Sequence, residues 1–432
     1  MTGRRGWGRM GAMAAEHIDD LARFVTASPS SFHAAAEVAR RLDAAGFTQQ
    51  AEDAPFTIEP GGGYVLRDGA IVAWHVPSSA DAAHSGFRIV GAHTDSPSLK
   101  LKPQPTAFSV GWQQAAVEVY GGPLPNQWLD RELGLAGRVV TRSGEQVLVQ
   151  TPAWLRVPQV APHLDRSVNE SLRLDRQQHL KPIYSVGRPD LDLLQLIAEH
   201  ADLEVADVAS HDLYCYVTEP PAVFGPTGEF FASSRLDNLS SVHAGLVALI
   251  DSESNGDITV LACFDHEEVG SASRSGGAGP LLEQVMRRLA GALGVEGDGW
   301  HRMLARSSCI SADAGHAIHP NYPHLHDPEH RPLLNAGPLL KHNANLRYTS
   351  DAASSALWRR ACEEAGVPTQ DFVSNNAVPC GSTIGPMTAE RLGVLMCDVG
   401  IPLLSMHSTR ELAGVNDPGW LADALTAYYA GA

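Results

Sequence analysis

The sequence predicts an α/β protein with a mixed, mostly parallel central sheet flanked by helices. The clearest indication is the apolar run Ile258-Thr259-Val260-Leu261-Ala262-Cys263-Phe264, which is typical of a strand buried on both faces. The segment Asp265-His266-Glu267-Glu268 follows it, with two adjacent carboxylates beside a histidine. Ligands of open α/β sheets bind outside the carboxyl ends of the strands, so this segment is a candidate site.

Four further segments repeat this arrangement along the chain. We expect a strand over 87–92 before His93-Thr94-Asp95, a strand from Cys309 to Ala312 before Asp313, and a strand over 401–406 before His407. Residues 233–238, which include Asp237, lead into a helix with apolar residues at helical spacing, namely Leu239, Val242, Leu246, Val247 and Ile250. Because each segment brings one residue type that can bind a metal, we expect them to converge on a single site.

The residue types indicate which metal the site would bind. Two imidazoles and three carboxylates without a thiolate suit zinc, cobalt or manganese. Five protein ligands are too many for one catalytic zinc, but they fit two ions that share a bridging carboxylate. Glu267 beside Glu268 allows one carboxylate to bind metal while the other takes a proton from the attacking water. Asp95, two residues after His93, is placed to hold the second nitrogen of that imidazole.

The order of these motifs closely resembles that of the aspartyl aminopeptidases, which are cytosolic two-zinc exopeptidases. The resemblance runs from about residue 17 to the end of the chain. It rests on the segments 91–97, 234–238, 265–271, 311–313, 316–321, 381–386 and 406–411.

The resemblance implies a zinc-exopeptidase-like fold and a role for each site residue. Asp237 would bridge two zinc ions, His93 and Asp313 would complete one site, and Glu268 and His407 the other. Glu267 would be the general base, and Asp95 would hold the imidazole of the ligand His93 in place. It also implies a cis peptide bond between Asp237 and Asn238.

The stretch between Asp95 and Asp237 contributes no ligand and is rich in strand-like segments. One expected hairpin pairs 137–142 with 146–150 through a turn at Ser143-Gly144. We therefore expect an inserted β-rich domain over 103–232 and a discontinuous catalytic domain over 14–102 and 233–432. The resemblance implies that the insertion mediates dimerisation and that the dimers build a dodecamer.

Substrate preference depends on two residues that the resemblance singles out. Lys341 matches a position that meets an acidic side chain of the substrate, with a solvated loop lysine as the alternative. His163 matches a histidine that reaches a neighbouring subunit's active site, with a surface or dimer-interface histidine as the alternative. The chain departs from the pattern at Gly315, where relatives can carry a larger side chain, so the strictness of an acidic preference stays open.

Composition restricts the partners and the compartment. A net charge of −17 argues against binding to nucleic acid or an acidic membrane surface. No apolar run approaches the roughly 20 residues of a membrane span, and six scattered cysteines suit a reducing cytoplasm.

We also expect a final helix with Asp417 as its N-cap, Pro418 in its first turn, and an apolar face of Leu421, Leu425 and Tyr428.

The function expected from the sequence is zinc-dependent removal of N-terminal residues from peptides, with a preference for Asp and Glu. Cobalt or manganese could substitute for zinc. One alternative is a two-metal aminopeptidase or amide deacylase with neutral substrates. Another is a non-catalytic assembly protein of the same fold.

Overall fold

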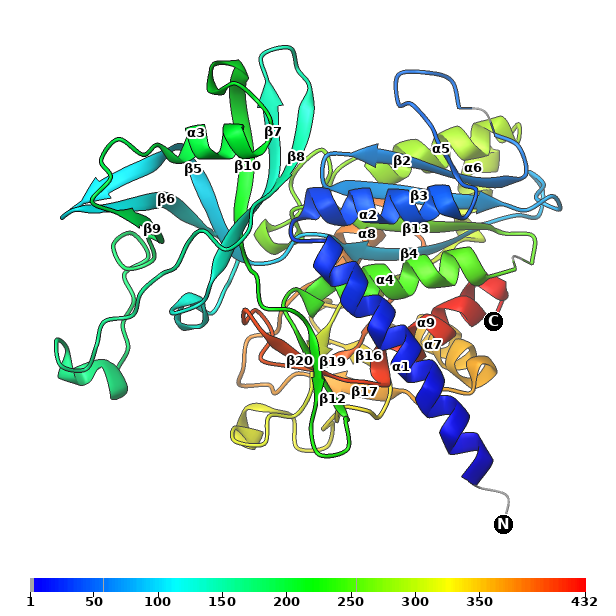
Figure 1. Cartoon of the computed structure of the whole chain (residues 1–432). Helices are drawn as coiled ribbons and strands as arrows, with labels where there is room; N and C mark the ends of the chain where they lie inside the picture. Colours follow the sequence, from blue (N-terminus) through cyan, green and yellow to red (C-terminus); the bar gives the residue numbers. More distant parts are fainter. Residues whose placement is uncertain (1–3, 57, 254) are drawn as a thin grey trace.

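The structure is a computed structural model that describes residues 4–56, 58–253 and 255–432, with side chains described from residue 15 on. The described residues form three sheets with flanking helices (Figure 1). The largest sheet has nine strands. In spatial order they are β1 (Thr48–Gln49), β2 (Gly61–Arg67), β3 (Ala70–Val76), β13 (Ile258–Phe264), β4 (Phe87–His93), β14 (Ser308–Ala312), β18 (Leu395–Gly400), β16 (Leu339–His342) and β17 (Gln370–Val373).

The centre of this sheet is parallel, antiparallel pairs join it to the strands on either side, and the outermost pairs β1/β2 and β16/β17 are again parallel. β4 runs parallel to both β13 and β14, and β14 runs parallel to β18. β3 pairs antiparallel with β13, and β16 pairs antiparallel with β18. The predicted mixed, mostly parallel sheet is confirmed. Since Phe264 pairs with His93, the carboxyl ends of β13 and β4 lie at the same edge.

Helices cover both faces of the sheet. One face packs against α1 (Arg4–Ala27), α2 (Ser31–Ala44), α4 (Leu236–Asp251), α7 (Ala352–Ala365) and α9 (Asp417–Ala430). The other face packs against α5 (Leu281–Ala292), α6 (Asp298–Ala305) and α8 (Ile384–Leu392). In β13, Leu261 and Cys263 point into the first core, while Val260 and Ala262 point into the second. This alternation explains why every residue of β13 is buried.

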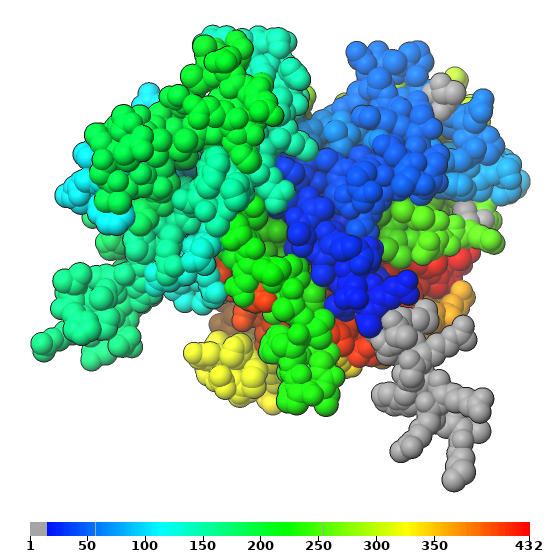
Figure 2. All heavy atoms as spheres, in the orientation of Figure 1, coloured from blue at the N-terminus to red at the C-terminus, as the bar shows by residue number. Residues whose placement is uncertain are grey.

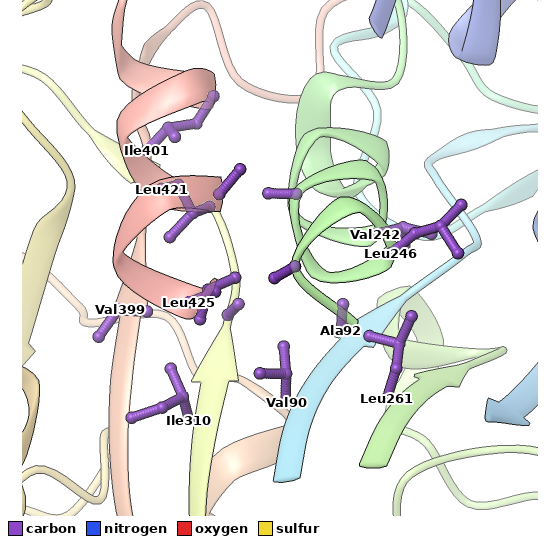
Figure 3. Packing of buried hydrophobic residues seen from close by; sticks show 14 of the residues in the cluster. Val90, Ala92, Val242, Leu246, Leu261, Ile310, Val399, Ile401, Leu421 and Leu425 are labelled. Carbon is purple, nitrogen blue, oxygen red and sulfur yellow. The ribbon is translucent and has the colours of Figure 1, made fainter. Parts of the chain in front are cut away.

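Figure 3 shows part of the first core, where side chains of α4 and α9 meet the sheet. The apolar face expected for α9 is confirmed, because Leu421, Leu425 and Tyr428 are fully buried. The expected cap is wrong: Asn416 precedes the helix, and Asp417 is its first residue. The Asp417 carboxylate instead accepts hydrogen bonds from the backbone N–H groups of residues 335 and 337. In α4, Leu239, Val242 and Leu246 are buried as expected, but Ile250 is 36% exposed.

A six-stranded antiparallel sheet with its own apolar core stands beside the large sheet (Figures 1 and 2). In order it contains β8 (Gln146–Gln150), β7 (Leu133–Thr141), β10 (Val208–Val217), β5 (Ser98–Ser109), β6 (Trp112–Tyr120) and β9 (Ile183–Val186), and α3 (Leu193–His200) packs on it. The expected hairpin is confirmed, since β7 pairs with β8, and its turn is centred on residues 142–143, one position before the expected 143–144.

The third sheet has five short strands. In order they are β11 (Ala222–Phe224), β12 (Phe230–Ser233), β20 (Glu411–Gly414), β19 (Pro402–Leu404) and β15 (Gly315–His316). None of the helices in the described residues is both long and apolar enough to cross a membrane.

Candidate metal and catalytic site

The five expected metal ligands lie together at one edge of the large sheet. His93 is the last residue of β4, Asp313 follows β14, and Glu268 lies in the short 3-10 helix η4 (Glu267–Val269) after β13. Asp237 is the second residue of α4, and His407 follows β19. The peptide bond between Asp237 and Asn238 is cis, as the resemblance implied.

The donor atoms of the described residues fall into three groups, of which two share Asp237 and the third combines His93, Glu267 and Glu268. His93, Asp237 and Asp313 form one group, and Asp237, Glu268 and His407 form another, each with its donor atoms within 4.8 Å of one another. Asp237 Oδ1 lies 3.3 Å from His93 Nε2, whereas Oδ2 lies 3.3 Å from His407 Nε2. The two oxygens of one carboxylate therefore face two different ligand groups.

The residues present fit divalent metal ions. Within the described residues, Asp237 Oδ1 and Glu268 Oε1 are buried without a hydrogen-bond partner, although such atoms are normally satisfied. Burial and the charge of Asp237 raise the pKa of Glu268 well above its usual range. Burial would lower the pKa of His407, but Asp237 and Glu268 outweigh it and raise the pKa to about 10. A cluster of buried carboxylates and imidazoles that cannot all keep their preferred charge is a site that a cation would relieve.

Asp95 organises the backbone around the ligands. Its carboxylate accepts hydrogen bonds from the N–H groups of Glu267 (3.0 Å) and Glu268 (3.1 Å). His93 Nδ1 lies 3.0 Å from the backbone carbonyl oxygen of Asp95 and 3.4 Å from Oδ1 of its carboxylate. Asp95 thus holds both the imidazole of His93 and the turn that carries the two glutamates.

Glu267 is the candidate base, next to the ligands in the same cavity. Burial is the main cause that raises its pKa, to about 7; His93 opposes the shift and Asp313 adds to it. A general base works best when its pKa lies near the working pH, and a carboxylate with a pKa near 7 meets this condition.

Three residues that the sequence did not single out also form hydrogen bonds with residues of this site. The Tyr120 hydroxyl donates to Asp95 Oδ2 at 2.8 Å, and the Gly122 carbonyl oxygen lies 2.9 Å from His407 Nδ1. Glu411 accepts from the backbone N–H groups of Asp237 (3.0 Å) and His407 (2.7 Å). Glu411 lies in the segment 406–411 that carries the resemblance, whereas no local pattern marked Tyr120 or Gly122.

Lys341 lies in the wall of the same cavity, which has a volume of about 420 Å³. It belongs to β16 and is 2% exposed, so the alternative of a solvated loop lysine is wrong. Its Nζ donates to the Ala314 carbonyl oxygen at 2.8 Å and lies 3.6 Å from Asp313 Oδ1. A Cβ atom at Gly315 would lie 3.2 Å from Lys341 Cε and 2.5 Å from Leu339 Cδ1, so the glycine leaves room for the lysine.

The structure does not bring His163 to the site of its own chain. His163 is exposed, in the segment that links β8 to β9. Figures 1 and 2 show this blue-green segment reaching away from the rest of the molecule, at the lower left.

Comparisons with known proteins agree with this geometry. The family model described as aminopeptidase I zinc metalloprotease (M18) matches residues 24–429. The probable M18 family aminopeptidase 2 of Streptomyces coelicolor is 51% identical over 420 residues, covering 95% of this chain and 97% of the relative. The protein of the same name from Pseudomonas aeruginosa is 44% identical over 431 residues, covering 97% of this chain and 99% of the relative.

Solved structures are similar over nearly the whole chain. A cryo-EM structure of the Ape4 and Nbr1 complex has a TM-score of 0.92 at 33% identity, covering 97% of this chain and 86% of that chain. A structure of the S. cerevisiae mApe1 dodecamer has a TM-score of 0.83 at 27% identity, covering 96% of each. The chain belongs to the M18 family of zinc metalloaminopeptidases.

Proposed function

We propose that this aminopeptidase holds two zinc ions per chain and preferentially removes N-terminal Asp and Glu residues from peptides. The observation that carries the two-ion proposal is Asp237, whose oxygens face separate ligand groups. His93 and Asp313 would complete one site, and Glu268 and His407 the other. Cobalt or manganese would suit the same donors.

Bound zinc would polarise the scissile carbonyl and lower the pKa of the attacking water. Glu267 takes the proton from that water and passes it to the leaving amine, for which a pKa near 7 is suited. Asp95 keeps Glu267 and Glu268 in place through their backbone N–H groups. The free α-amine of the substrate would bind beside these carboxylates, which limits cleavage to the N-terminal residue.

The acidic preference rests on Lys341. It is a cation in the wall of a cavity that Asp237, Glu267, Glu268 and Asp313 also line. Since the chain carries a net charge of −17, attraction of an acidic side chain must come from such a local cation. A neutral preference remains the second candidate, because the Lys341 ammonium already contacts Ala314 and Asp313.

We also propose that the chain works as a homo-oligomer in the cytoplasm, as a dodecamer built from dimers. Residues 103–232 would form the dimerisation domain, inserted into a catalytic domain of residues 14–102 and 233–432. His163 would reach a neighbouring subunit's active site, which is supported by its exposure on a segment remote from its own cavity. The similar mApe1 of S. cerevisiae forms a dodecamer in its solved structure.

Glu267→Gln tests the catalytic proposal, with Glu268→Gln as a matched variant of the neighbouring residue. We expect Glu267→Gln to keep both metals and lose at least about 10²-fold in kcat, the usual scale of lost general-base catalysis. Glu268→Gln should lose metal together with activity. Metal analysis beside kinetics on aminoacyl amides decides between the roles. If Glu267→Gln loses metal in proportion to activity, Glu267 is a ligand and not the base.

A further inference from the structure

A second pocket opens beside the catalytic cavity. Its volume is about 270 Å³, and it shares His316, Tyr348 and Gly381 with the lining of the catalytic cavity. A substrate bound at the metal ligands therefore lies next to this pocket, because the two cavities share these lining residues.

The two cavities differ in chemistry. Four carboxylates and Lys341 line the catalytic cavity. The described residues that line the second pocket include no Asp, Glu, Lys or Arg. Phe372 and Tyr348 form its buried floor, with ring centroids 6.3 Å apart. Its rim carries exposed apolar side chains: Tyr322 is 53% exposed, Leu325 47% and Val378 37%.

Tyr348 links the chemistry of the two cavities. On the catalytic side, Lys341 Nζ lies 5.3 Å from the centroid of the Tyr348 ring. In the second pocket, Phe372 packs against the same Tyr348 ring. Successive side chains of an extended peptide point to opposite sides of the backbone. If the first side chain of the substrate turns toward Lys341, the next one is directed away from that charge.

We propose that the second pocket binds an apolar or aromatic side chain of the residue that follows the scissile bond. This inference rests on the proposed peptide-cleaving site and adds a preference at the second position of the substrate. A pocket with an aromatic floor and no Asp, Glu, Lys or Arg in its described lining gains free energy when it takes an apolar side chain out of water, and an unpaired charge there would be costly.

The experiment compares kcat/KM for Asp-Phe and Asp-Gly peptide amides, with aspartyl amide as a substrate that lacks a second side chain. Burial of one aromatic side chain should favour Asp-Phe over Asp-Gly by roughly 10-fold or more. Val378→Asp places a charge on the rim and should abolish this ratio while aspartyl amide turnover stays unchanged. Val205→Asp is the control, because Val205 is 40% exposed and lines neither cavity.

Three results would overturn the proposal. The first is an equal kcat/KM for Asp-Phe and Asp-Gly. The second is an equal ratio of these two values in the Val378→Asp and Val205→Asp variants. The third is a loss confined to phenylalanine amide in Val378→Asp, which would assign the pocket to the N-terminal residue itself. A parallel series with N-terminal Leu separates this inference from the acidic preference. Faster Leu substrates with an intact Phe-to-Gly ratio would contradict the role of Lys341 and support the pocket.

Discussion

Tyr120→Phe should weaken the metal site, although the hydrogen-bond partner of Tyr120 is Asp95, which is not one of the five expected metal ligands. Tyr120 ends β6 of the six-stranded sheet, and its hydroxyl donates to Asp95 Oδ2 at 2.8 Å. Burial and the charges of Asp95 and Asp265 raise the pKa of Tyr120 far above its usual range, so the hydroxyl remains a donor. Without it, Asp95 loses one of the bonds that fix its carboxylate.

The expected size of this effect follows from the bonds that remain. A hydrogen bond to a charged group contributes about 1.5–3 kcal/mol. Asp95 Oδ2 keeps the Glu268 N–H at 3.1 Å, so we expect the lower end, about 1.5 kcal/mol or roughly 10-fold. This agrees with the 10- to 100-fold losses typical of residues that orient metal ligands.

The assay measures zinc affinity by chelator competition, together with kcat and KM. Tyr216→Phe is the matched control, because the Tyr216 hydroxyl also makes a buried bond, 2.7 Å to the Thr151 carbonyl oxygen, within the same sheet. We expect Tyr120→Phe to lose roughly 10-fold in zinc affinity or kcat, with KM and the melting temperature close to those of Tyr216→Phe. If the two variants bind zinc equally and turn over equally, Tyr120 does not position the site.

Three further predictions concern the cavity. Lys341→Ala should reduce turnover of N-terminal Asp substrates by roughly 10- to 150-fold relative to Leu substrates, because a charge-assisted bond is lost; paired steady-state kinetics measure this, and equal losses would contradict the role. Asp237→Ala should not retain two tightly bound ions, since one carboxylate serves both ligand groups, and metal analysis of the purified variant checks it. Apparent zinc affinity should increase as the pH rises from 6 to 9. In the metal-free protein the pKa of His407 is raised to about 10, so its imidazole holds a proton that metal binding must release, and the raised pKa of Glu268 acts in the same direction. A flat pH profile in chelator competition would contradict this.

Much of the large sheet and its ligands could be predicted from the sequence. The apolar run of β13 and the residues after it identified the site, because parallel neighbours end at the same edge. His93 and Asp313 followed from the same logic at β4 and β14. These residues are specified locally: each lies at the end of a strand, and the strand pattern shows where it ends.

The residues that the sequence missed depend on contacts between sheets. Tyr120 and Gly122 come from the end of β6, and their partners Asp95 and His407 lie 25 and 285 positions away in the chain. No local period encodes how the six-stranded sheet packs on the large one. Whether Lys341 lies in the pocket or in solvent could not be predicted for the same reason, because its burial depends on the pairing of β16 with β18 and on the space left by Gly315.

All three sheets contribute to the ligand geometry. The large sheet brings His93 and Asp313, and the five-stranded sheet begins β20 with Glu411, which holds the backbone of Asp237 and His407. The end of β6 supplies Tyr120 and Gly122 from the six-stranded sheet. Without a cation, the buried carboxylates repel one another, and this repulsion opposes the packing that brings them together, although a protonated His407 offsets part of it. Metal ions would remove that repulsion, so metal binding and the packing of the three sheets should stabilise each other.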